Sequence, residues 1–239
     1  MKSGITAFFF CLLIIGVAVW VSHKPSTLQA SDPQIVNKTQ AFQVLNLKLN
    51  LGGDAYILTL QNGYSKNING YSIGVGASKL DVELTNGERV IAPGDTTQET
   101  IPVSNLRSAS DPNQPLNSIS ILAVMFDDAT SDGDYKAITS LKQRRAGVKL
   151  QLQRINAILE STLASSGDIT PDTLNKIESQ ISELSVEAPA GQSPIIKSGL
   201  KSAKEDLISE LGKLKRNNSG LKEGLKRIKD KVQRKEARL

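Results

Sequence analysis

The stretch Ser118-Ile-Ser-Ile-Leu-Ala-Val-Met-Phe126 is followed by the acidic run Asp127-Asp-Ala-Thr-Ser-Asp-Gly-Asp134 and then by Tyr135-Lys-Ala-Ile-Thr-Ser-Leu141. Before the acidic run apolar residues recur at every second position, which is typical of strands; after it they recur at every third or fourth, which is typical of amphipathic helices. The charge changes at the same place: residues 24–135 hold 7 Lys and Arg against 12 Asp and Glu, and residues 136–239 hold 21 against 12. The sequence therefore predicts an α+β protein, with a β-domain before the acidic run and a basic helical region after it.

The β-domain is expected over residues 41–127. Leucines at positions 45, 47, 49 and 51 alternate with polar residues, so each set lies on one face of a strand. Asn86-Gly87 is a strong hairpin-turn signal, and several short strands with turns at this spacing indicate an antiparallel β-sandwich.

Residues within this β-domain carry a family resemblance. The segments Leu60-Gln61-Asn62, Ser65-Lys66, Ile68 and Tyr71-Ser72-Ile73 make residues 42–126 similar to exported bacterial immunoglobulin-like domains of the FxLYD type. The resemblance implies an Ig-like β-sandwich and carries over no functional residue.

Residues 136–239 are expected to form an α-helical hairpin or coiled coil. Thr170-Pro171 is a helix-start signal, and Asn217–Gly220 favours a break, with Ser219 capping a new helix. Apolar residues at helical spacing form a stripe along these helices, and such a stripe must pack against another helix. That helix belongs to the same chain, to a second copy in a homo-oligomer or to another protein. The stripe comprises Leu207, Leu211, Leu214, Leu221, Leu225, Ile228 and Val232.

The N-terminal residues 1–23 contain an uncharged apolar run from Ile5 to Val21. As a helix this run is roughly 25 Å long, slightly short of a ~30 Å hydrocarbon core. It is either an uncleaved signal-anchor or a signal peptide cleaved after Ala30. Both alternatives place the body outside the cytoplasm, membrane-anchored in the first case and secreted or periplasmic in the second. Residues 24–40 are expected to be a linker.

The rare residue types exclude several chemistries. Cys11 and His23 are the chain's single Cys and single His. The body therefore lacks disulfides, a Cys/His zinc site and any nucleophile that a histidine activates. No phosphate-binding or dinucleotide-binding glycine motif is present, and no cofactor is expected.

The acidic run is a candidate Ca²⁺ loop because oxygen ligands at alternate positions and a turn-forming glycine suit that ion. Position twelve, however, is Thr139 instead of the required bidentate Glu, and a strand precedes the run where an EF-hand needs a helix. An acidic turn is therefore favoured over a metal site. The candidate ligands are Asp128, Thr130, Asp132 and Asp134.

The C-terminal residues 213–239 form a predicted basic amphipathic helix, with 11 Lys and Arg against 3 Asp and Glu. Such a helix is either a solvated coiled-coil flank or a surface for anionic lipid or an envelope polymer. Nucleic acid is disfavoured because no aromatic residues interleave the basic ones. The candidate interaction residues are Lys222, Lys226, Arg227, Lys229, Arg234 and Lys235.

The candidate catalytic groups are two pairs of carboxylates, Asp81 with Glu83 and Asp127 with Asp128, and the S-x-x-K match Ser198–Lys201. Nothing in the sequence places these residues in a cleft, and a four-residue match in a Lys-rich helix is expected by chance. The sequence thus favours an exported, membrane-tethered, non-enzymatic interaction or structural protein of the cell envelope. The alternative is a carboxylate-dependent hydrolase or lyase on the sandwich.

Overall fold

The computed structural model describes residues 32–76, 78–83, 90–107, 117–165, 167–217 and 219–239. Within these residues the predicted mixed α+β class is confirmed, with sheets followed by helices along the chain. The apolar N-terminal segment lies outside the described residues. Among the helices that the structure does describe, none has the length and apolar character needed to cross a bilayer.

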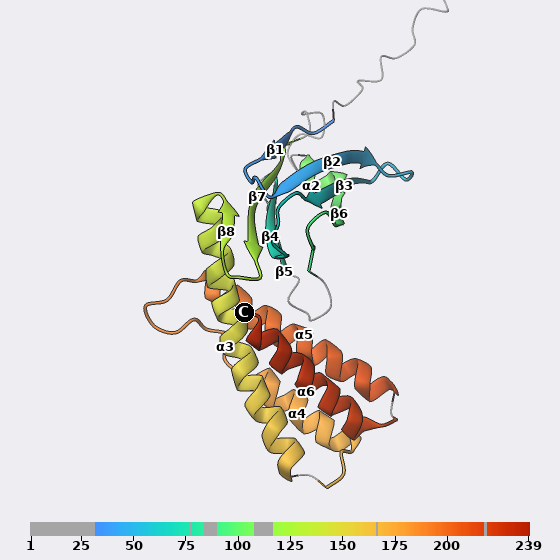
Figure 1. Ribbon diagram of the computed structural model, residues 1–239. Helices are drawn as coiled ribbons and strands as arrows, with labels where there is room; N and C mark the ends of the chain where they lie inside the picture. The colour runs from blue at the N-terminus through green and yellow to red at the C-terminus, as the bar shows by residue number, and fades with distance from the viewer. Residues whose placement is uncertain (1–31, 77, 84–89, 108–116, 166, 218) are drawn as a thin grey trace, which may run out of the picture. The chain divides into compact units, whose positions relative to one another are not determined.

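The first part of the chain forms two β-sheets (Figure 1). One has the order β1-β7-β4-β5, with β8 also paired to β7, and the other has the order β2-β3-β6. A short helix, α2 (Val103–Leu106), follows β6. The strands are β1 (Ile35–Asn37), β2 (Phe42–Leu49), β3 (Ala55–Asn62), β4 (Ile68–Val75), β5 (Ser78–Glu83), β6 (Thr96–Pro102), β7 (Ile119–Phe126) and β8 (Ser131–Gly133).

The two sheets share one apolar core. Leu58 and Leu60 of β3 are fully buried in the same cluster as Ile73 of β4, because alternate residues of each strand point inward. Phe42 meets Tyr71 edge to face, with ring centroids 5.3 Å apart, and the Tyr71 hydroxyl donates to Glu99 of β6 in the other sheet. Burial and the bond to Glu99 raise the pKa of Tyr71 well above its usual value, so this link between the sheets is uncharged on the tyrosine side.

One sheet contains a strand that was not predicted, β1, which is parallel to its neighbour. β1 pairs in parallel with β7, so residues 35–37 of the predicted linker belong to a sheet. The carboxylate of Asp132 in β8 accepts the backbone N–H groups of Gln40 and Ala41 at 2.6 and 2.9 Å. These bonds hold the segment that leads into β2 against β8.

The second part of the chain is a bundle of four helices (Figure 1). Thr170 caps α4 with Pro171 in the first turn, as predicted, and the Thr170 hydroxyl accepts the Thr173 N–H. Ser193 performs the same role before α5, where its hydroxyl accepts the Ile195 N–H at 3.3 Å. The helices are α3 (Tyr135–Ser165), α4 (Pro171–Glu183), α5 (Ile195–Asn217) and α6 (Leu221–Ala237).

Helices α3 and α5 cross at a pair of glycines. A Cβ atom built on Gly199 would overlap the carbonyl oxygen of Arg144 and lie 2.8 Å from the Val148 nitrogen. A Cβ on Gly147 would overlap the carbonyl oxygen of Ile196 in the same way. The two backbones therefore touch directly, and both glycines are required for that approach.

The predicted break between the last two helices is confirmed, because α5 ends at Asn217 and α6 begins at Leu221. The predicted cap is wrong: Gly220, not Ser219, is the N-cap, with φ of 60° and no capping side chain. This left-handed conformation favours glycine, which lets the chain reverse within a few residues. The apolar stripe consequently folds back on itself.

The stripe residues lie in an intramolecular core with α3 and α4. Leu211 and Leu225 are fully buried there, and Leu221 is half-buried. Of the partners considered for the stripe, the structure thus provides helices of the same chain. The stripe is therefore packed inside the bundle and does not form a continuous exposed apolar face.

A polar and apolar junction joins α3 to the first sheet. Ala137 and Leu141 pack on β7. The guanidinium of buried Arg145 donates to the backbone oxygen and the Oδ1 of Asn69 in β4, at 3.1 and 2.8 Å. Arg144 donates to the carbonyl oxygen of Asp81 in β5 at 3.1 Å. These contacts fix the start of α3 on the sheet.

Candidate functional site

The outer face of α6 carries the six basic residues that the sequence analysis predicts as an interaction surface. Its apolar stripe faces the core, so the charged residues between the stripe positions face outward. Arg227 and Arg234 lie seven residues apart, roughly 10 Å along the same face of the helix. Both are exposed, and neither side chain has a hydrogen-bond or ion-pair partner among the described residues. Asp230 is an exposed acid between them.

The other four predicted interaction residues have partners within the chain. Lys222 donates to the carbonyl oxygen of Gly167 at 2.6 Å, beyond the end of α3. Three further lysines pair with acids: Lys226 with Glu223 at 3.0 Å, Lys229 with Glu160 at 3.4 Å and Lys235 with Asp206 at 3.3 Å. Within the part of the chain that the structure describes, the four lysines therefore have partners and the two arginines have none.

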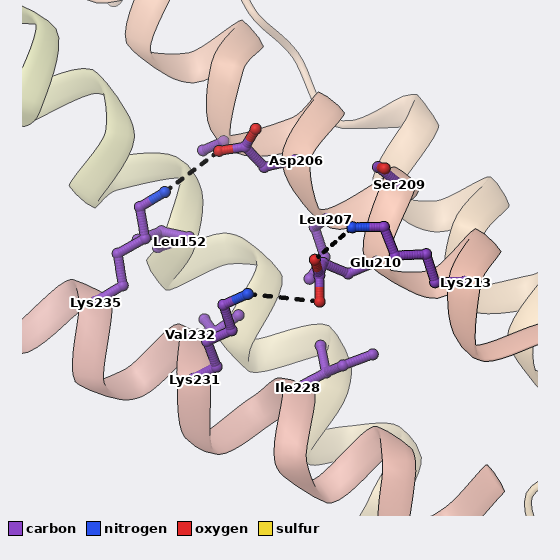
Figure 2. A pocket seen from close by; sticks show the side chains of 11 residues that line it. Leu152, Asp206, Leu207, Ser209, Glu210, Lys213, Ile228, Lys231, Val232 and Lys235 are labelled. Atoms are coloured by element: carbon purple, nitrogen blue, oxygen red, sulfur yellow. Dashed lines mark hydrogen bonds and ion pairs between the residues drawn. The ribbon is translucent and has the colours of Figure 1, made fainter. Parts of the chain in front are cut away.

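A groove between α5 and α6, called the α5–α6 groove below, adjoins this basic face (Figure 2). It consists of two adjoining hollows of about 160 and 210 Å³. Figure 2 shows the first hollow, where Lys231 and Lys213 both reach Glu210, at 3.5 and 3.2 Å, and Lys235 reaches Asp206. The second hollow is bordered by Arg227. The apolar part of the lining comprises Leu152, Ala203, Leu207, Leu214, Ile228 and Val232.

Glu210 remains charged in this groove. Partial burial alone would raise its pKa, but the hydrogen bond from Lys213 and the positive charge of Lys231 outweigh that effect and lower the pKa below its usual value. The Glu210 carboxylate therefore forms ion pairs with both Lys213 and Lys231.

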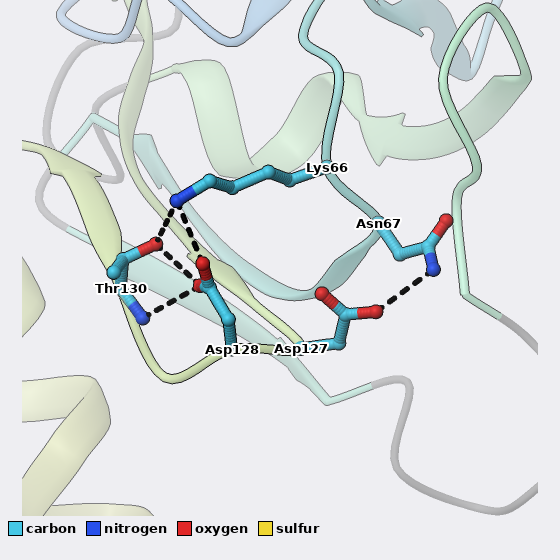
Figure 3. Close-up of polar contacts among 5 residues, drawn as sticks. All are labelled: Lys66, Asn67, Asp127, Asp128 and Thr130. Carbon is cyan, nitrogen blue, oxygen red and sulfur yellow. Dashed lines mark hydrogen bonds and ion pairs between the residues drawn. The ribbon is translucent and has the colours of Figure 1, made fainter.

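The acidic run forms a turn followed by β8, and its four candidate Ca²⁺ ligands all have protein partners. Asp128 and Thr130 share one of these partners, Lys66 (Figure 3). Lys66 pairs with Asp128 at 2.7 Å and donates to Thr130 at 3.0 Å. Asp132 accepts the backbone N–H groups of the segment before β2. Asp134 caps α3 by accepting the Ala137 N–H at 3.1 Å, which lowers the pKa of that carboxyl. The structure therefore gives each of these residues a bond that holds the fold together.

Asp128 is expected to titrate at unusually low pH. The hydrogen bonds from Lys66 and Thr130 lower its pKa from 3.8 to about 2. Because the folded value lies below the unfolded one, the stabilisation is fully present above about pH 4 and disappears as the pH falls from about 4 to 2. NMR titration of the Asp128 carboxyl should give a midpoint near 2, and Lys66→Gln should raise it. A midpoint near 3.8 in the unmodified chain contradicts the ion pair.

The candidate catalytic carboxylates Asp127 and Asp81 each have a different partner within the fold. Asp127 accepts the side-chain amide of Asn67 at 2.8 Å (Figure 3), while Asp81 in β5 pairs with Lys79 at 3.1 Å. Glu83 lies two residues further along β5. The described residues contain no group of three or more His, Cys, Asp or Glu side chains placed to hold a metal ion.

The S-x-x-K match also separates in the structure. The Ser198 hydroxyl donates to the carbonyl oxygen of Ile195 at 2.7 Å, and Lys201 pairs with Glu205 at 3.7 Å. Neither contact is the serine–lysine pair that such a motif needs.

Sequence reasoning did not single out four charged residues of the α5–α6 groove. Asp206, Glu210 and Lys213 are on α5, and Lys231 is on α6. The available signal was weak: with a break at Asn217–Gly220, α6 had to run antiparallel to α5 and bring these positions together. Helical spacing alone does not determine which turns face each other.

Three comparisons with known proteins gave no match: no protein-family model, no curated protein and no solved structure resembles the chain at a significant level. The likeness of residues 42–126 to FxLYD-type domains therefore stays a prediction.

Proposed function

We propose that this chain is an exported, membrane-tethered, non-enzymatic interaction protein of the cell envelope, whose helical bundle binds an anionic component. In this proposal the Ile5–Val21 run is the tether and the two sheets form an Ig-like sandwich that spaces and orients the bundle. The junction at Arg145 and Asn69 supports a fixed orientation, since it ties α3 to a central strand.

The observation that carries the proposal is a pair of exposed arginines on α6 that have no hydrogen-bond or ion-pair partner among the described residues. Arg227 and Arg234 belong to a region of 21 Lys and Arg against 12 Asp and Glu. Guanidinium groups bind phosphate or carboxylate in a fork geometry and remain charged at all physiological pH values. An anion bound there gains contacts without breaking an ion pair of the folded chain.

Binding to anionic surfaces is expected to depend on salt. The full chain is placed in neutral phosphatidylcholine nanodiscs and tested for capture of vesicles that contain phosphatidylglycerol. Capture should exceed that of phosphatidylcholine vesicles and fall as the ionic strength rises, because salt screens exposed charges. The double variant Arg227→Gln with Arg234→Gln should weaken it, whereas Lys48→Gln in β2 should not.

Two results would count against the proposal. Equal capture of neutral and anionic vesicles, or capture that is insensitive to salt, excludes an electrostatic surface. A preference for nucleic acid over anionic vesicles and acidic polysaccharide at the same ionic strength would show that the basic face binds nucleic acid and not an envelope component.

A further inference from the structure

The second hollow of the α5–α6 groove carries more positive than negative charge. Lys213, Arg227 and Lys231 border it, and among the described residues that line it Glu210 is the single acid. That carboxylate already accepts both lysines. The hollow therefore has three cations for one anion and offers a position for a second negative group beside Arg227.

The floor of the same groove is apolar. Ile228 and Leu214 lie directly beside the cations of the second hollow, and Leu207 and Val232 continue the apolar surface into the first. A hydrophilic anion would use only the charged rim. A ligand that joins an anionic group to an apolar group uses both parts, which is the usual composition of a binding pocket.

We propose that the α5–α6 groove binds one anionic phospholipid, with the phosphate against Arg227, Lys213 and Lys231 and the first methylene groups against Ile228 and Leu214. The inference rests on the proposed function, since it names an anionic phospholipid as the anionic component. The second hollow has a volume of about 210 Å³, which is larger than the roughly 150 Å³ of a cavity that holds benzene. The rest of the acyl chains remain outside the groove.

The test follows methyl resonances of Ile228, Leu214 and Val232 in the full chain in phosphatidylcholine nanodiscs. Dihexanoyl-phosphatidylglycerol, a short-chain lipid, is titrated in. Saturable shifts of these methyl groups are expected, and Arg227→Gln should weaken the apparent affinity about tenfold or more, since it removes hydrogen bonds between charged groups. Arg234→Gln is the matched control, because it removes the same charge from α6 outside the groove; its effect should be about twofold or less.

Four outcomes overturn the groove site. Equal losses for the two variants indicate a diffuse electrostatic surface. If glycerol phosphate binds as tightly as dihexanoyl-phosphatidylglycerol, the apolar floor does not contribute to binding. If dihexanoyl-phosphatidylcholine binds as tightly, the net negative charge of the lipid does not contribute. Absence of shifts in a chain that still captures phosphatidylglycerol vesicles places the lipid elsewhere. Failure of the proposed function is a different result, namely no preferential capture of anionic vesicles at all.

Discussion

Gly199→Ala is expected to destabilise the folded chain by about 3 kcal/mol, at the upper end of the range for overpacking. A single methyl group at this position meets the backbone carbonyl of Arg144 and the nitrogen of Val148. Backbone atoms of α3 cannot move aside as a flexible side chain would, so the two helices must separate. This cost exceeds the roughly 1 kcal/mol that alanine gains over glycine in a helix.

Thermal unfolding measures this effect, with an expected decrease in melting temperature of roughly 6–12 °C for a chain of this size. Gly212→Ala on the same helix is the control, because its added Cβ meets only the end of the Arg216 side chain at 3.7 Å. That variant should be neutral or slightly more stable. A Gly199→Ala protein that melts at or above the temperature of the unmodified chain contradicts the close crossing of α3 and α5.

Arg145→Leu is the second substitution with a large expected effect, about 3 kcal/mol. The guanidinium is almost fully buried and donates to two oxygens of Asn69. Leucine fills part of the volume but leaves those oxygens buried without the charged donor. The start of α3 would then be held on the sheet by the packing of Ala137 and Leu141 and by the bond from Arg144 to Asp81.

Hydrogen exchange and chemical denaturation separate this effect from a general loss of stability. Amides of β4 and the first turns of α3 should exchange faster in Arg145→Leu, before those of α6. Lys142→Leu, at an exposed position three residues earlier on α3, should change stability by about 0.5 kcal/mol or less. Unchanged stability and exchange in Arg145→Leu would show that the junction does not depend on this contact.

Features that depend on neighbouring residues were predictable from the sequence. Thr170-Pro171 marks a helix start because the cap and the fixed φ of proline act within one turn. The change from strand to helix periodicity near Tyr135 follows from the same local rules, and α3 begins there. The break after Asn217 was predictable for a similar reason, although Gly220 and not Ser219 is the cap.

Features that depend on distant residues were not predictable in this way. Asp132 reads as one more acid in a solvated turn, yet its partners Gln40 and Ala41 are 92 and 91 residues away. Arg145 is 76 residues from Asn69. Likewise, the spacing of the apolar stripe shows that it needs a partner but not which one, since helices of the same chain and of a second chain satisfy it equally.

The most direct measurement of export and tethering is fractionation of cells that express the full chain, combined with protease accessibility from outside and an intact mass. We expect an uncleaved, membrane-retained protein whose helical bundle is digested when protease is added to the outside of intact cells. A soluble product that begins near Ser31 would contradict the tether. A cytosolic protein that external protease does not reach would contradict export, and with it the assignment of the basic face to a component of the envelope.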